Sequence, residues 1–149
     1  MNKEEYKGIF VFAEQREGEI KNVAFELIGK ARELAEAVGE DVTALLLGDQ
    51  VSPLAQSLIE AGADRVLVID SPELKDYLTE PYTQAVTHLI KTYKPEVLLI
   101  GASTIGRDLG PRVSARVKTG LTADCTALAV SDERDLLMTR PAFGGNLMA

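Results

Sequence analysis

The sequence predicts an α/β protein with a doubly wound, mostly parallel sheet. Four short segments are apolar throughout, and each is followed by a stretch in which apolar residues recur at helical spacing. Such strands are buried on both faces, and right-handed crossovers place helices on both sides of the sheet. The chain has 149 residues, 46% of them hydrophobic and 26% charged, so residues 1–149 are expected to form one Rossmann-like domain.

The first part of the chain contains three of the predicted strands and two helices. The first helical pattern is followed by Gly39, a residue typical of the position just past a helix end. The second begins at Ser52-Pro53, which has the form of an N-cap with proline at the first helical position. The predicted strands are 8–13, 42–48 and 65–70, and the helices are 19–38 and 52–62.

The second part begins with a polar, proline-marked loop that has room for one helical turn. It then contains a helix, the fourth apolar strand and an amphipathic stretch with Leu109, Val113 and Val117 on one face. An alternating fifth strand, an acidic turn and a further strand predict a C-terminal β hairpin extension. The loop is 71–80, the helix 81–93 and the strand 95–101, and the amphipathic stretch follows residues 102–108. The fifth strand is 121–130, the acidic turn 132–135 and the further strand 136–140.

Composition excludes several functional classes. The net charge of −7 and the pI near 4.8 argue against binding to nucleic acid. No apolar run approaches the ~20 residues of a membrane span, and the N-terminus lacks the pattern of a signal peptide. Cys125 is the single cysteine, so a reducing, cytoplasmic location is expected.

One segment of this acidic chain is basic. Residues 103–120 carry Arg107, Arg112, Arg116 and Lys118 against Asp108 alone, a charge of +3 within a remainder of −10. The segment is either a solvated helix face or a local site for an anion or an acidic partner.

The richest candidate binding site follows the fourth predicted strand. Ligands of open α/β sheets bind outside the carboxyl ends of the strands. Ser103 and Thr104 offer hydroxyls at a helix start, Gly106 allows close approach, and Arg107 suits a carboxylate or phosphate. A helix N-cap with a packed glycine turn explains the same residues equally well. The segment matches neither a Walker loop nor a dinucleotide fingerprint.

Two further regions are candidate interfaces. Arg112 and Arg116 lie four residues apart on one side of the predicted helix, where arginine stems often cover apolar surface and where a subunit could also dock. Near the end of the chain, a glycine pair beside an aromatic residue predicts either a turn or bulge, or a backbone surface held against a flat ligand or another subunit. The residues concerned there are Arg140, Phe143, Gly144, Gly145 and Asn146.

The sequence offers no catalytic set. His88 is the only histidine and lies among apolar helix residues, so a surface or half-buried packing role is expected. Cys125 has no basic neighbour that would activate its thiol. One histidine and one cysteine cannot build a zinc site, and no metal is expected.

Four long segments resemble the α subunit of electron transfer flavoprotein. They are GIFVFAEQREGEIKNVAFELIGKARELA at 8–35, DSPELKDYLTEPYTQAV at 70–86, GASTIGRDLGPRVSARVKTGLTADCTAL at 101–128 and LLMTRPAFGGNLMA at 136–149. The resemblance therefore covers essentially the whole chain. Residues 106–116 are more similar to bacterial members, which include electron-bifurcating and nitrogen-fixation relatives.

The resemblance implies a role in a heterodimer that carries electrons between flavoprotein dehydrogenases and an acceptor. In this family the α subunit has an N-terminal α/β domain of the nucleotide-hydrolase-like (Rossmann-like) type and a C-terminal domain that binds FAD, while the β subunit holds AMP or a second FAD. This chain matches only the first of these domains, so the FAD domain is expected to be absent from it and no cofactor is expected on it alone. The implied work of the domain is that of a scaffold and β-subunit interface, not of an enzyme.

A different class of protein remains the alternative: a stand-alone adenine nucleotide-binding module of the universal-stress type. That reading requires a glycine-rich phosphate loop after the fourth strand. Glycines at 101, 106 and 110 match such a loop only in part.

Overall fold

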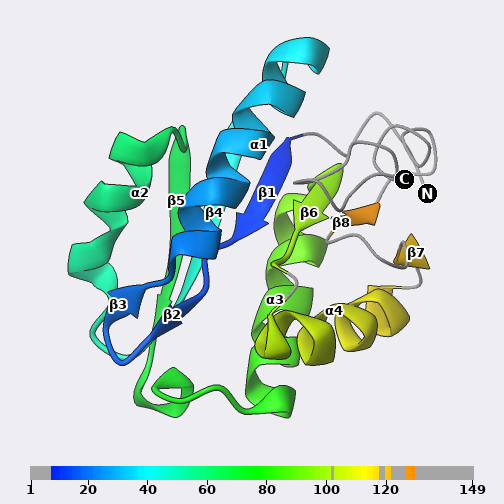
Figure 1. Ribbon diagram of the computed structural model, residues 1–149. Coiled ribbons are helices and arrows are strands. Elements are labelled where there is room, and N and C mark those ends of the chain that lie inside the picture. Colours follow the sequence, from blue (N-terminus) through cyan, green and yellow to red (C-terminus); the bar gives the residue numbers. More distant parts are fainter. Residues whose placement is uncertain (1–7, 102, 118–119, 122–126, 130–149) are drawn as a thin grey trace.

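A computed structural model describes residues 8–101, 103–117, 120–121 and 127–129, and its main feature is a six-stranded sheet with the order β5-β4-β1-β6-β8-β7 (Figure 1). Four adjacent strands, from β5 at one edge through β4 and β1 to β6, run parallel, whereas β8 is antiparallel to both β6 and β7. The strands are β1 (Ile9–Phe12), β4 (Val42–Gly48), β5 (Arg65–Asp70), β6 (Val97–Leu99), β7 (Gly120–Leu121) and β8 (Ala127–Ala129).

Helices cover both faces of this sheet, which gives the predicted doubly wound α/β architecture (Figure 1). One face is covered by α1 and α2, and the other by α3 and α4. Two short 3-10 turns, η2 and η3, lead toward α2 and α3. The bounds are α1 (Asn22–Val38), η2 (Ser52–Leu54), α2 (Ala55–Ala61), η3 (Pro72–Leu74), α3 (Thr79–Tyr93) and α4 (Thr104–Val117).

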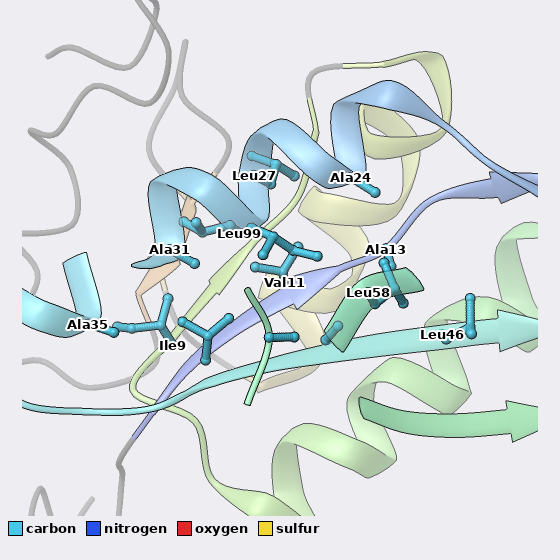
Figure 2. Packing of buried hydrophobic residues seen from close by; sticks show 14 of the residues in the cluster. Ile9, Val11, Ala13, Ala24, Leu27, Ala31, Ala35, Leu46, Leu58 and Leu99 are labelled. Carbon is cyan, nitrogen blue, oxygen red and sulfur yellow. The ribbon is translucent and has the colours of Figure 1, made fainter. Parts of the chain in front are cut away.

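The buried strands explain why their sequences are apolar without alternation. Ile9 and Val11 of β1 point into the cluster beneath α1, which Figure 2 shows, whereas Phe10 and Phe12 point into the cluster beneath α3 and α4. Each face therefore requires an apolar side chain. Full burial of one aliphatic side chain contributes about 1.5–3 kcal/mol, so the two clusters are the main source of stability.

Helix α1 ends where the sequence predicts. Gly39 adopts the left-handed conformation with φ of 72°, and its N–H bonds to the carbonyl of Ala35. Glycine reaches that conformation without the steric cost that a Cβ atom imposes.

The start of this helix differs from the prediction of 19–38. Residues Glu19–Ile20 form strand β3, which pairs with β2 (Gln15–Arg16) in a small antiparallel hairpin, and α1 begins only at Asn22. Glu17 and Gly18 have φ values of 53° and 79°, so they form the tight turn of this hairpin. Apolar residues recur at helical spacing from Ile20 onward, so the sequence pattern did not reveal this turn.

The C-terminal region is described only in part. In place of the single predicted strand 121–130, the structure has two short strands that pair with each other, β7, which begins one residue earlier, and β8. The predicted turn at 132–135 and strand at 136–140 lie outside the described residues. In the part of the chain that is described, no helix has the length and apolar character needed to span a bilayer.

Candidate functional site

The sheet has its topological switch point between β1 and β6. From β1 the chain proceeds to β4 and β5 on one side, and then returns to place β6 on the other side of β1. The segments that follow β1 and β6 therefore diverge to opposite faces, and between them lies the position where open α/β sheets bind ligands. Two segments meet there, the β2–β3 hairpin region and the start of α4.

Ser103 and Glu14 occupy this position. The Ser103 hydroxyl donates to Glu14 Oε1 at 2.5 Å and accepts from the backbone N–H of Gly106 at 3.1 Å. The carbonyl of Ser103 accepts from the N–H of Arg107 at 2.9 Å, so Ser103 caps α4. Glu14 is only 8% exposed. The positive end of α4 thus already faces a carboxylate from the same chain.

The glycines of this segment allow one part of the backbone to pack against another. A Cβ atom at Gly106 would collide with the carbonyl oxygen of Gly101, and one at Gly101 would lie 2.7 Å from Val23 Cγ2. This packing, which involves α4, the end of β6 and α1, corresponds to the alternative of a helix N-cap with a packed glycine turn.

Thr104 and Arg107 are the members of the predicted set that face outward. Both side chains are exposed. The Arg107 side chain makes no hydrogen bond or ion pair with the other described residues. Of the four predicted residues, Ser103 and Gly106 therefore form the start of α4, whereas Thr104 and Arg107 lie on its surface.

Gln15 holds the neighbouring hairpin against the sheet. Its side chain is buried; Nε2 donates to the carbonyl of Leu47 at 3.0 Å, and Oε1 accepts from the N–H of Gly18 at 3.3 Å. A Cβ atom at Gly48 would lie 2.6 Å from Gln15 Nε2. This amide fixes the hairpin at the carboxyl edge of β4.

Asp70 fixes the next loop in the same way. Its carboxylate accepts from the N–H of Gln50 at 2.6 Å, the N–H of Ser52 at 3.0 Å and the Ser52 hydroxyl at 2.8 Å. The Ser52 hydroxyl is the main cause that lowers the pKa of Asp70, followed by the backbone donors. These bonds hold the loop after β4 against the end of β5. Gln50 in this loop has a φ of 59°, a left-handed conformation that is uncommon for residues other than glycine.

The predicted interface arginines of α4 have partners inside the domain. Arg116 Nη2 contacts both carboxylate oxygens of Glu80 on α3, at 2.6 and 2.7 Å. Arg112 Nε lies 3.4 Å from Asp108 Oδ1. Arg112 keeps 60% of its side chain exposed and Arg116 keeps 40%, so both still contribute charge to the surface.

Asp108 joins α4 to the start of α3 and to the segment just before it. Its Oδ2 accepts from the hydroxyls of Tyr77 and Thr79, each at 2.6 Å. The Thr79 and Tyr77 hydrogen bonds are the main causes that lower the pKa of Asp108. Burial, followed by the contact with Asp108, raises the pKa of Tyr77. Two charged residues of the basic segment, Asp108 and Arg116, therefore stabilise the packing of α4 beside α3.

The remaining predicted residues add no contact to this edge. Arg140, Phe143, Gly144, Gly145 and Asn146 lie outside the described residues. His88 is exposed on α3, as a surface role predicts. Within the described ranges there is no group of three or more histidine, cysteine or carboxylate side chains that could hold a metal ion.

Sequence reasoning did not identify Glu14 as the partner of Ser103. The two residues are 89 positions apart, and only the parallel pairing of β1 with β6 brings them together. A local signal was nevertheless present, because a carboxylate directly follows a buried strand at an edge where ligands bind.

Comparison with known proteins identifies the family. The family model described as "Electron transfer flavoprotein domain" matches residues 9–149. Over 150 residues the chain is 53% identical to electron transfer flavoprotein subunit alpha of Clostridium acetobutylicum and 55% identical to Protein FixB of Clostridium saccharobutylicum; each match covers 100% of this chain and 45% of the relative. It is 50% identical over 149 residues to the lactate dehydrogenase (NAD(+),ferredoxin) subunit LctC of Acetobacterium woodii, a match that covers 100% of this chain and 36% of that protein.

The chain thus spans less than half the length of these curated relatives. The match includes the described part of the chain from Ile9 onward, together with the switch point and α4. On this evidence the chain belongs to the electron transfer flavoprotein family.

Proposed function

We propose that this chain works as the N-terminal α/β domain of an electron transfer flavoprotein α subunit. Its role is to hold the β subunit and to shape the surroundings of a flavin that another domain binds. The complete heterodimer carries electrons between flavoprotein dehydrogenases and an acceptor in the cytoplasm, with FAD on the rest of α and AMP or a second FAD on β. The names of the two clostridial relatives support this assignment.

One structural observation carries the proposal. The N-terminus of α4, where related sheets receive a phosphate, is capped by Ser103 and faces the Glu14 carboxylate. An incoming phosphate would meet a like charge there. What the edge presents outward is Thr104 and Arg107, which suit a protein surface or the outer part of a bound flavin.

The same observation weighs against the stand-alone nucleotide-binding module. A phosphate loop needs backbone N–H groups that are open to the ligand and glycines that let the phosphate approach. Here the N–H of Gly106 bonds to Ser103, and Gly106 is packed against Gly101. The glycine pattern is thus accounted for by packing within the chain.

The α4 surface extends this proposed interface. Arg112 and Arg116 remain partly exposed while they pair with Asp108 and Glu80. We place the segment from Arg140 to Asn146 in the same interface as part of the proposal. The chain itself acts as a carrier subunit without catalysis of its own, and the relationship to a dehydrogenase subunit in Acetobacterium woodii supports a parent complex that serves a dehydrogenase.

Replacement of Arg107 with alanine in the reconstituted α–β complex tests this role. We expect β-subunit affinity to fall about three- to tenfold, chiefly through a slower association rate, because a rim charge steers encounter more than it holds the complex. Stability of the domain should not change, since the Arg107 side chain has no partner among the described residues. Association and dissociation rates from surface plasmon resonance give the answer.

Lys91→Ala is the matched control. Lys91 is an exposed cation in the last turn of α3, at the opposite end of the domain from the carboxyl edge of the sheet. If both variants bind the β subunit as the unaltered protein does, and the flavin potential is unchanged, the proposed role of Arg107 is wrong.

A further inference from the structure

A surface groove lies away from the switch point, beside the outer strand of the sheet. It has a volume of about 680 Å³ and is formed by the end of β5, η3 and the first turns of α3. Its apolar lining comes from all three elements and consists of Ile69, Leu74, Leu78, Pro81 and Ala85. Two carboxylates, Glu73 and Glu80, lie at the same groove.

Leu78 is the most unusual residue of this groove. It is 57% exposed, the highest value among the exposed large apolar side chains of the described residues. It also occupies the N-cap position of α3 and makes no capping hydrogen bond there. Serine, threonine, aspartate and asparagine are preferred at that position, and leucine forgoes about 1 kcal/mol of capping. A residue that violates both burial and capping preferences is expected at a functional surface.

The strand beside the groove has an open edge. Among the described residues β5 pairs only with β4, so its other side presents unpaired backbone groups. Val68 on this strand is 37% exposed, and four apolar residues separate Arg65 from Asp70. Edge strands are commonly protected by charged side chains, proline or a bulge; β5 has no proline or bulge, and its charged residues, Arg65 and Asp70, stand only at its two ends.

The edge and the groove can be used by a single ligand. Ile69 lines the groove, and Leu67 packs on the same side of the sheet. Val66 packs on the opposite side, and Val68 shares its orientation because side chains alternate along a strand. An added strand would therefore place every second side chain in the groove and the others beside Val68.

The charge around the groove selects the chemistry of that ligand. Residues 70–80 carry Asp70, Glu73, Asp76 and Glu80 against Lys75, a net charge of −3. Glu80 is already bound by Arg116, whereas the Glu73 side chain is exposed at the groove. A basic residue in the ligand would meet Glu73 without displacing an existing ion pair.

We propose that this groove and the edge of β5 dock an extended segment of a partner protein, with apolar residues at alternate positions and a flanking lysine or arginine. The segment adds as a strand to β5, sets one apolar side chain beside Leu78 and pairs its basic residue with Glu73. Strands β4 and β1 lie between this surface and the switch point, so the proposal does not depend on the role of Arg107.

A capped peptide of the sequence Lys-Val-Thr-Val-Thr-Val-Lys, titrated into the isotope-labelled full chain, tests the proposal. We expect saturable NMR shifts of the β5 amides and of the residues around Leu78. The same peptide with its alternate backbone nitrogens methylated cannot donate to the edge, and it should bind at least about tenfold more weakly. A peptide with glutamate in place of both lysines should also bind more weakly.

Two variants distinguish a loss of binding at the groove from a loss of folding. Leu78→Ser removes the apolar anchor but supplies a preferred N-cap residue, so the peptide should bind about tenfold more weakly while thermal stability is kept or raised. Glu73→Lys should weaken binding about three- to tenfold, and Glu33→Lys on the exposed side of α1 should have no effect. Equal binding of the methylated peptide, an unchanged affinity in Leu78→Ser, or no β5 shifts at millimolar peptide would each overturn the proposal.

Discussion

Replacement of Gly106 with alanine is expected to lower the free energy of unfolding by about 3 kcal/mol or more. The added Cβ would collide with the carbonyl oxygen of Gly101, a backbone atom that cannot turn aside as a side-chain end does. Overpacking of this kind typically costs about 1–3 kcal/mol, and the rigid neighbour places this site at the upper end or above. Alanine gains only about 1 kcal/mol over glycine in helix propensity, so the steric term wins.

Urea unfolding of Gly106→Ala beside Gly29→Ala measures this effect against a matched control. Gly29 also lies in a helix, but a Cβ atom there meets nothing within 4 Å. That variant should gain about 0.5–1 kcal/mol from helix propensity. The packing of α4 on β6 is described wrongly if both variants are equally stable.

Replacement of Ser103 with alanine should have the second largest effect, a loss of about 1–3 kcal/mol. The change removes the capping bond to the N–H of Gly106 and leaves the largely buried Glu14 carboxylate without its donor. Ser57→Ala is the control, because that hydroxyl makes a single bond to the carbonyl of Leu54. Its loss should cost less.

A double-mutant cycle with Glu14→Ala shows whether the two residues act together. Once Glu14 is removed, Ser103→Ala should cost less than it does alone, with a coupling energy between about 0.5 and 3 kcal/mol. Additive losses in thermal or urea unfolding would mean that the Ser103–Glu14 contact does not stabilise the switch point.

The fold could be predicted because three adjacent strands, β4, β1 and β6, are buried on both faces. Apolar runs such as 42–48 have no polar alternation, and the helices between them have one apolar stripe, so local pattern and global fold agree. The β2–β3 hairpin could not be predicted from the same pattern. It has only two residues in each strand, and its turn depends on the left-handed conformation of Glu17, which helical spacing does not reveal.

The candidate site was predicted in its local part only. Ser103 at a helix start follows from neighbouring residues, and the structure has Ser103 as the cap of α4 and Gly106 packed against Gly101, as in a helix N-cap with a packed glycine turn. The partners that determine their chemistry come from distant segments. Glu14 reaches Ser103 across 89 residues, and Glu80 reaches Arg116 across 36. Such contacts follow from strand order and helix packing, which residue spacing alone does not specify.

Equilibrium dialysis of the purified chain against FAD and AMP tests the central claim most directly. The claim is that the chain fills the ligand position of its sheet with its own Ser103 and Glu14 and serves as a scaffold. We expect neither nucleotide to be retained above the level seen with an unrelated protein at the same concentration. Stoichiometric retention of FAD or AMP would contradict the account and would make this chain a cofactor-binding module.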